Sequence, residues 1–348
     1  MSHKPNQFQR RWLVTGVAGF IGSNLAAFLL DRGETVVGLD NFFSGKRANI
    51  ERLVRAYGSR FDFIEGDILD AEVVRRAVEG CRAVAHLAAQ VSVIRSIDLP
   101  KETYDINTNG FLSVLQGAAA SGVESLIYAS SCAVYGDNDA LPLHESEEPR
   151  PMSPYAASKL ANEVYAAGFH ILAPNLNVVG LRFFNIFGAW QDAAGGYAAV
   201  IPMWIGLLLN GKQPILFGDG SATRDFCHVH NVCEAIWCAA NAGDSVNGKV
   251  FNVASGIPIR LDALYSLIVQ LLCEVGVSTE LPRPTYKPWR TGEIMHSYGS
   301  PTKSSELLHF RCEVTLENGL RNMLVEEYGA HEALKVNLYH SQRSPKHE

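Results

Sequence analysis

The chain has 348 residues, of which 47% are hydrophobic and 19% charged, and a formal net charge of −6. This length suggests two domains or one large domain with a smaller lobe, and the composition is that of a globular protein with a large core. The acidic balance disfavours a non-specific nucleic-acid binder, and no apolar run approaches the roughly 18 residues of a membrane span. Seven cysteines without a repeating spacing, and an N-terminus without the apolar stretch of a signal peptide, indicate a cytoplasmic protein with reduced thiols.

Short apolar runs alternate with helical segments through the first half of the chain. The apolar runs, which are typical of strands buried on both faces, cover residues 12–15, 35–39, 60–64, 83–87, 126–130 and 177–183. Helical periodicity covers residues 21–30, 71–79, 104–121 and 155–169. The alternation predicts the α/β class, with a Rossmann-like doubly wound parallel sheet covered by helices on both faces.

After residue 185 the pattern is less regular. Residues 188–196 are typical of a loop, residues 200–209 of a helix, and short strands and helices mix as far as about residue 328. We expect residues 1–185 to form the main domain and residues 186–330 to form mainly a smaller mixed α/β substrate lobe, with at least one segment rejoining the main sheet. Residues 331–348 are polar and aperiodic, which favours a mobile tail.

Three glycines, Gly16, Gly19 and Gly22, lie between the first predicted strand and the first helix. Glycines at this spacing tighten the turn, let the backbone approach a pyrophosphate, and bring the phosphate to a helix N-terminus. Asp40 ends the second strand, where a carboxylate binds the adenosine ribose hydroxyls and repels a 2′-phosphate. Asn41 follows it, rather than an arginine that would favour NADP. The pattern predicts a site for NAD.

Tyr155 and Lys159 are four residues apart on a predicted helix and therefore share a face. A phenol with a pKa of about 10 is a poor base at neutral pH. A neighbouring ammonium and the positive nicotinamide ring would stabilise its phenolate form. Ser131 leaves the fifth strand at the carboxyl edge, where doubly wound sheets bind ligands, so we expect it to meet Tyr155 there. Asn107, early in the long helix, is a candidate polar support.

Together these motifs resemble those of the extended short-chain dehydrogenases/reductases, and within them the NAD-dependent UDP-sugar 4-epimerases, most of all the bacterial UDP-N-acetylglucosamine 4-epimerases. The resemblance covers residues 12–328 and is carried by residues 16–22, 40–41, 66–68, 86–89, 130–136, 155–159 and 181–185. It implies that Ser131, Tyr155 and Lys159 are catalytic, and that tightly bound NAD oxidises C4 of the sugar transiently and returns the hydride to the opposite face. The NAD contacts that it implies are Gly16, Gly19, Phe20, Ile21, Gly22, Asp40, Asn41, Phe42, Ser44, Gly45, Asp67, Ile68, Leu87, Ala88, Ala89, Asn107, Tyr155, Lys159 and Phe184.

Two related activities are disfavoured by the residues after the catalytic hydroxyl. The resemblance implies an acidic pair there for sugar 4,6-dehydratases and a nearby glutamate for UDP-glucuronate decarboxylases. This chain has Cys132 and Ala133. The UDP-sugar contacts that the resemblance implies are Ser92, Ser131, Tyr155, Asn185, Ala199, Val200, Trp204, Ile215, Phe217, Arg224, Arg290, Glu293 and Ser297.

Ser297 bears on the choice of sugar. It aligns with the position that gates the hexose 2-substituent in these epimerases, where a tyrosine excludes an N-acetyl group and a small residue admits it. The expected reaction is therefore interconversion of UDP-GlcNAc and UDP-GalNAc. The alternatives are a UDP-uronic acid (UDP-GlcNAcA/UDP-GalNAcA or UDP-glucuronate), whose carboxylate Arg95 or Ser92 would bind, and UDP-glucose/UDP-galactose.

Other interpretations have less support. The string Cys227, His228, His230 and Cys233 does not have the spacing of a structural zinc site, so no metal is expected. A non-catalytic dinucleotide sensor would be expected to lose part of the Ser/Tyr/Lys set, and an ordinary NAD-linked dehydrogenase needs no UDP-binding lobe. The resemblance also implies a homodimer, in which helices 104–121 and 155–169 form a four-helix bundle with their symmetry mates. We therefore expect a UDP-sugar and a second copy of the chain as partners, and no nucleic acid or membrane.

Overall fold

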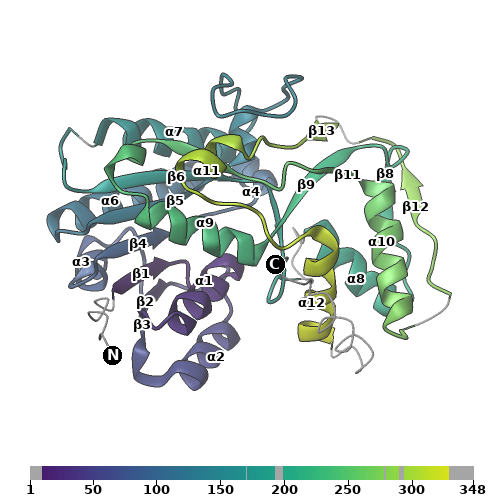
Figure 1. Cartoon of the computed structure of the whole chain (residues 1–348), viewed down its shortest axis with the longest axis horizontal. Coiled ribbons are helices and arrows are strands. Elements are labelled where there is room, and N and C mark those ends of the chain that lie inside the picture. Colours follow the sequence, from purple (N-terminus) through teal and green to yellow (C-terminus); the bar gives the residue numbers. More distant parts are fainter. Residues whose placement is uncertain (1–9, 170, 193–198, 278–279, 290–293, 329–348) are drawn as a thin grey trace, which may run out of the picture.

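The computed structural model describes residues 10–169, 171–192, 199–277, 280–289 and 294–328. Its centre is a seven-stranded sheet, all of whose neighbouring strands are parallel, in the order β10-β6-β5-β4-β1-β2-β3 (Figure 1). The strands are β1 (Arg11–Thr15), β2 (Thr35–Asp40), β3 (Phe61–Glu65), β4 (Ala83–His86), β5 (Ser125–Ser131), β6 (Asn177–Phe183) and β10 (Val250–Val253). The predicted α/β class and doubly wound parallel sheet are confirmed.

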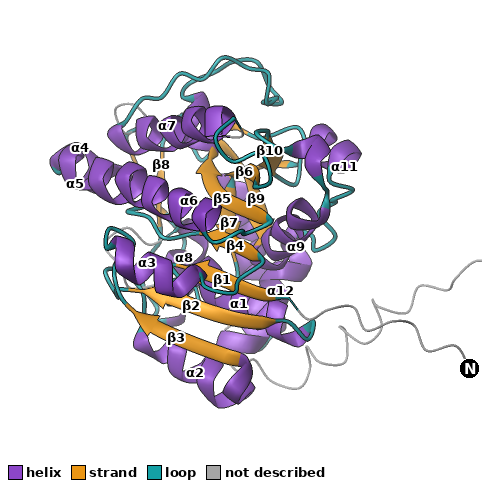
Figure 2. Cartoon of the chain, turned by 90° about the vertical axis from the view of Figure 1, so that its left-hand side faces the viewer, coloured by secondary structure: helices purple, strands orange, loops and turns teal. Residues whose placement is uncertain are grey.

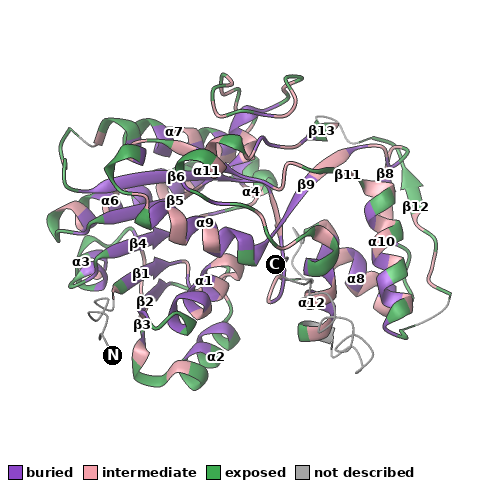
Figure 3. Ribbon diagram, in the orientation of Figure 1, coloured by how far each residue is buried: buried purple, intermediate pink, exposed green. Residues whose placement is uncertain are grey.

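Helices cover both faces of this sheet (Figure 2). One layer consists of α1 (Phe20–Asp31), α2 (Arg47–Tyr57) and α9 (Val229–Asn241). The other consists of α3 (Ala71–Val78), α6 (Gly110–Ala120) and α7 (Pro154–Phe169). Because both faces are covered, the central strands have no solvated side, and β6 is buried along its whole length (Figure 3). This explains why the strand sequences are continuous apolar runs rather than alternating ones.

The segment predicted as one long helix over residues 104–121 is interrupted. It consists of α5 (Pro100–Tyr104), a π-helical turn (Asp105–Asn109) and α6. The wider turn places the amide of Asn107 in the interior, where it bonds to groups from two other segments. Within residues 10–169, α2 and α4 (Val93–Asp98) were not predicted. Each buries three side chains or fewer.

Most of the chain after β6 forms a smaller lobe beside the carboxyl edge of the sheet (Figure 1), whereas α9 and β10 belong to the main domain. Its helices are α8 (Val200–Leu209), α10 (Leu261–Glu274) and α12 (Leu316–Tyr328), and α11 (Thr302–Leu307) returns to β10. Its strands are β7 (Asn185–Phe187), β8 (Ile215–Phe217), β9 (Thr223–His228), β11 (Pro258–Arg260), β12 (Thr285–Lys287) and β13 (His296–Ser297). Strand β9 pairs with β7, β11 and β13, so it joins the main domain to the lobe. Within the described ranges, no helix combines the length and apolar character that crossing a bilayer requires.

Candidate active site

The turn between β1 and α1 has the close contacts that its glycines predict. A Cβ at Gly22 would lie 2.1 Å from the carbonyl oxygen of Gly16, and Gly16 itself has a φ of 69° and packs against the backbone of Ala88. No side chain caps α1, and its first backbone bond runs from Ser23 N to Gly19 O. The N–H groups of the first turn are therefore directed beyond the helix, toward a site where a diphosphate fits.

Asp40 lies at the carboxyl end of β2, beside this turn. Its carboxylate accepts hydrogen bonds from Ala18 N at 2.9 Å and from Phe42 N at 2.7 Å. Burial raises the pKa of Asp40, while these two donors oppose the shift. A Cβ at Gly45 would lie 2.6 Å from the Ala18 side chain, so the turn after β2 packs directly on the glycine turn. The carboxylate is thus held at the edge where an adenosine ribose fits.

The remaining expected NAD contacts border the same edge. Asn41 donates to Asp67 Oδ2 at 2.9 Å, which joins the ends of β2 and β3. The N–H groups of Leu87 and Ala88 donate to the hydroxyl of Thr15, which fixes the end of β4 against β1. Of the other expected NAD contacts, Ser44 is exposed. Those that are partly or fully buried are Phe20, Ile21, Ile68, Ala89 and Phe184.

Ser131, Tyr155 and Lys159 meet at the carboxyl end of β5. Burial raises the pKa of Tyr155 to about 12, and the Ser131 hydroxyl opposes this shift. Lys159 is 4% exposed, its Nζ donates to Ala129 O at 2.9 Å, and it lies 5.9 Å from the centre of the Tyr155 ring. Burial lowers the pKa of Lys159 to about 8, so its ammonium form predominates at neutral pH. The Tyr155 phenol is therefore protonated in this arrangement. A further positive charge nearby would lower its pKa and favour the phenolate form.

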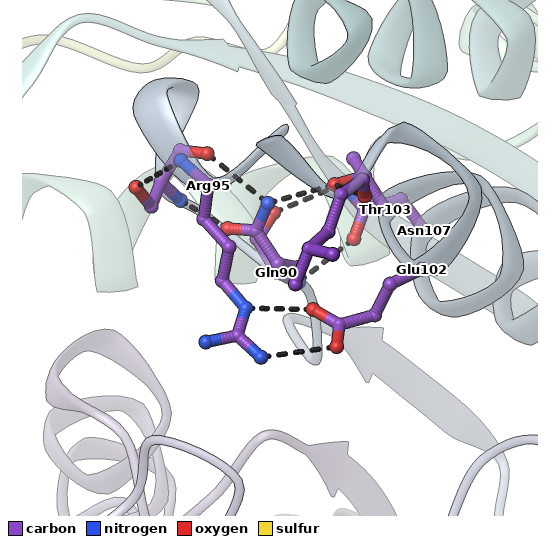
Figure 4. Close-up of polar contacts among 7 residues, drawn as sticks. Gln90, Arg95, Glu102, Thr103 and Asn107 are labelled. Carbon is purple, nitrogen blue, oxygen red and sulfur yellow. Dashed lines mark hydrogen bonds and ion pairs between the residues drawn. The ribbon is translucent and has the colours of Figure 1, made fainter. Parts of the chain in front are cut away.

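Asn107 connects α7 to the loop after β4. Its Oδ1 accepts from Gln90 N at 2.8 Å, and its Nδ2 donates to Gln90 O and to Ser158 Oγ, both at 3.0 Å. Ser158 in turn donates to the carbonyl oxygen of Tyr155 at 2.7 Å. Figure 4 shows Asn107 beside Gln90 and Thr103. Asn107 is buried in this network, which fits the polar support expected for it.

A buried ion pair, which the sequence analysis missed, fastens α7 to the sheet. Glu163 accepts from Arg182 Nε at 2.9 Å and from Arg182 Nη2 at 2.7 Å, and the hydroxyl of Ser130 also donates to it. The Glu163 and Arg182 side chains are 7% and 3% exposed. No local spacing marks Glu163, because its partner Arg182 is 19 residues away in the sequence. The pair fixes α7 next to the end of β5 that carries Ser131.

Strand β9 brings residues of the smaller lobe to this edge. Asn185 donates to Asp225 O at 3.1 Å, and Ser297 on β13 is paired in register with Arg224. The guanidinium of Arg224 lies close enough to Cys132 to lower its pKa, although burial dominates and raises it to about 11. The thiol next to Ser131 is therefore neutral. Because Arg224 lies near Cys132, its register partner Ser297 belongs to the part of the lobe close to Ser131.

Asp225 is a second buried group that the sequence analysis missed. Its carboxylate accepts from Ser255 N and Oγ at 2.8 and 2.7 Å, from Gly256 N at 2.9 Å and from Gly299 N at 3.3 Å. Burial raises its pKa, and these donors oppose the shift. A Cβ at Gly299 would lie 2.5 Å from the Phe184 ring. One carboxylate thus holds β9, the turn after β10 and the segment after β13 together beside Phe184.

The other expected substrate contacts are more dispersed. Trp204 is 1% exposed and packs edge-on against Tyr265 in the core of the lobe. Ser92 caps α4 by accepting from Arg95 N at 3.0 Å. Ala199 and Val200 begin α8, Ile215 and Phe217 are half-buried in β8, and Arg290 and Glu293 lie outside the described residues.

The cysteines and histidines of residues 227–233 make contacts within the protein itself. His228 accepts from His230 N at 3.3 Å and packs edge-on against Phe187. Within the described ranges, no three His, Cys, Asp or Glu side chains are grouped so as to hold a metal ion.

The fold and these groups define a dinucleotide-dependent enzyme with a serine, a tyrosine and a lysine at the carboxyl edge of its sheet. Residues 12–254 match the NAD dependent epimerase/dehydratase family, and the chain belongs to that family. It is an NAD-dependent epimerase, and NAD is its cofactor.

Three relatives illustrate the similarity. The chain is 36% identical to a UDP-glucose 4-epimerase of Mycolicibacterium smegmatis over 89% of this chain and 96% of the relative. A UDP-N-acetylglucosamine 4-epimerase from Methanobrevibacter ruminantium, solved in complex with UDP-N-acetylmuramic acid, is 33% identical with a TM-score of 0.83, covering 96% of this chain and 99% of that one. A UDP-glucose 4-epimerase of Thermus thermophilus, solved with NAD, is 32% identical with a TM-score of 0.80, covering 92% and 100%.

Proposed function

We propose that this UDP-sugar 4-epimerase interconverts UDP-GlcNAc and UDP-GalNAc. The observation that carries the choice of sugar is Ser297, a small side chain paired in register with Arg224 beside the catalytic serine. A serine leaves room for an N-acetyl group that a tyrosine would exclude. The likeness to the Methanobrevibacter epimerase, which is named for the N-acetylated sugar, supports the same choice.

The catalytic groups have the properties that this reaction needs. Bound NAD supplies a hydride acceptor and donor, and the positive charge of its oxidised ring. Tyr155 accepts the proton of the sugar 4-hydroxyl through the Ser131 hydroxyl, which already opposes the rise in its pKa. Lys159 contributes its ammonium charge, which further favours the phenolate. Tyr155 returns the proton when the second face of the sugar is reduced.

The chain also offers groups for each part of the two nucleotides. In this proposal Asp40 binds the adenosine ribose, and the N-terminus of α1 binds the NAD diphosphate. Arg224 binds the diphosphate of the UDP-sugar, where a guanidinium pairs well with phosphate oxygens. The neutral Cys132 thiol and Ala133 supply no acid or base for dehydration or decarboxylation.

The arrangement of Arg95 favours an N-acetylated sugar over a uronic acid. Its Nε and Nη2 donate to the two carboxylate oxygens of Glu102, at 2.6 and 3.0 Å. A second carboxylate, from a sugar, would have to compete with this pair. The Ser92 hydroxyl accepts a hydrogen bond as the cap of α4. The guanidinium expected to bind a uronate is thus already paired with a carboxylate of the protein.

The test is Ser297→Tyr, assayed by NMR with UDP-GlcNAc and separately with UDP-glucose, without added NAD. We expect kcat/KM for UDP-GlcNAc to fall at least about tenfold, and that for UDP-glucose to change less than about threefold, because steric exclusion acts only on the larger 2-substituent. Ser59→Tyr, at an exposed site in the turn before β3, is the matched control. Equal effects on both sugars would contradict the role of Ser297, and turnover of UDP-glucuronate instead of UDP-GlcNAc would favour the uronic-acid alternative.

We also propose a homodimer. The expected bundle helices, α6 and α7, bury Ala118 and Ala166 inside the subunit. Exposed apolar side chains instead gather on α4 and α7, which contact each other; they are Val93, Ile94, Ile97, Val164 and Tyr165. Such a patch is typical of an interface. Sedimentation equilibrium tests the proposal, since a dimer doubles the 38.1 kDa mass of the chain.

A further inference from the structure

The turn after β2 and helix α4, which lie on opposite sides of the glycine turn, touch each other. Phe43 lies in the turn after β2, and Arg95 lies on α4, which follows β4. The guanidinium carbon of Arg95 is 5.0 Å from the centre of the Phe43 ring. Because β2 and β4 flank β1 on either side, this contact spans the carboxyl end of β1. That end is where a doubly wound sheet binds its dinucleotide.

The Arg95 side of this contact is firmly anchored. Glu102 holds the guanidinium through two parallel hydrogen bonds, and Figure 4 shows the two groups facing each other. Gln90 donates to Ser92 O at 3.0 Å and to Thr103 Oγ1 at 2.8 Å, which ties the start of α4 to α5. A planar guanidinium held in this way presents a face to an aromatic ring.

The Phe43 side is an apolar ring kept at the surface. Phe43 is 46% exposed, and its N–H donates to Asn41 Oδ1 at 2.9 Å, which fixes the local turn. The preceding ring, Phe42, packs instead on Phe63 at 5.4 Å between ring centres. Phe43 therefore contributes little to the core, and its placement is explained by the contact with Arg95.

We propose that Phe43 and Arg95 form a clasp across the dinucleotide groove that slows the release of bound NAD and NADH. An enzyme that uses NAD without net redox change must keep the reduced form until the second half of its reaction. The clasp acts on the dinucleotide and not on the sugar. It therefore rests on NAD as the cofactor, whichever UDP-sugar is the substrate. Both residues are positioning residues that retain the cofactor.

The clasp is tested by the rate at which NADH leaves the enzyme. Holoenzyme loaded with NADH is mixed with excess NAD, and the loss of bound-NADH fluorescence gives the rate. An exposed cation–π contact predicts release about two- to fivefold faster in Phe43→Ser and in Glu102→Gln. Phe43→Tyr keeps the aromatic face and should release NADH at the wild-type rate. The matched control is Arg82→Gln, which breaks an ion pair with Glu124 at the opposite edge of the sheet.

The outcomes separate the clasp from a general loosening of the fold. Faster release in Phe43→Ser and Glu102→Gln, with Phe43→Tyr and Arg82→Gln at the wild-type rate, supports the clasp. The double variant Phe43→Ser/Glu102→Gln should then release NADH no faster than the faster single variant, because both remove one contact. Wild-type release in Phe43→Ser, or equal acceleration in Arg82→Gln, would overturn it. Neither result depends on which UDP-sugar is turned over.

Discussion

Replacing Glu163 by glutamine measures how strongly α7 is held on the sheet. The carboxylate accepts two hydrogen bonds from Arg182 and one from Ser130, all of them buried. Glutamine keeps the shape, but it removes the charge and turns an amide donor toward the guanidinium or the hydroxyl. Losing one partner of a buried ion pair costs about 3–5 kcal/mol, because the other charge stays unpaired. Since Arg182 Nη1 has no hydrogen-bond partner among the described residues, we expect the free energy of unfolding to fall by about 3 kcal/mol.

Urea unfolding of the holoenzyme, followed by circular dichroism, provides the measurement. Glu124→Gln is the matched control, because its ion pair with Arg82 is about half exposed and should contribute less than about 1 kcal/mol. The double variant Glu163→Leu/Arg182→Met removes both charges and should recover part of the loss. The reasoning is refuted if Glu163→Gln is no less stable than Glu124→Gln.

Two further perturbations test the cofactor turn and a buried histidine. Gly22→Ala places a Cβ against the carbonyl oxygen of Gly16. The resulting strain of about 1–3 kcal/mol predicts NAD binding roughly ten- to hundredfold weaker, as measured by calorimetry. The control is Gly168→Ala, whose Cβ would have nothing within 4 Å and which should bind NAD normally. Burial, helped by the charge of Lys159, lowers the pKa of His86 to about 3. Below a pH of about 6.5, His86 is protonated in the unfolded chain but stays neutral in the folded chain. The free energy of unfolding therefore falls by roughly 1.4 kcal/mol per pH unit as the pH drops toward 3. His86→Asn should lose clearly less stability between about pH 7 and pH 4.5, and an equal loss in both proteins would exclude His86 as the group responsible.

The main sheet could be predicted because its strands are buried on both faces. An apolar run such as residues 177–183 has no competing interpretation when helical segments flank it, and the structure has β6 over these residues. The helix predicted over residues 200–209 is likewise α8. By contrast, α2 packs through only three buried residues, and the π-helical turn around Asn107 depends on partners that are distant in sequence.

The site residues that escaped prediction are those whose role depends on a distant partner. Glu163 looks like an ordinary helix carboxylate until β6 brings Arg182 beside it. Asp225 likewise acquires its four donors only when residues 255, 256 and 299 are folded against β9. Trp204 illustrates the reverse case, because the sequence analysis placed it among the UDP-sugar contacts, whereas the structure buries it with Ile201, Ile205 and Leu208 in the core of the lobe.

The hydrogen bonds of Asp225 bear on how the sugar preference of such an enzyme can change. They fix the backbone around Ser297 through Gly299, two residues away, and so do not involve the Ser297 side chain. A substitution at position 297 therefore changes one side chain while the hydrogen bonds of Asp225 stay in place. If Ser297 selects the sugar as proposed, a single replacement at this position changes the preferred sugar and leaves Ser131, Tyr155 and Lys159 where they are.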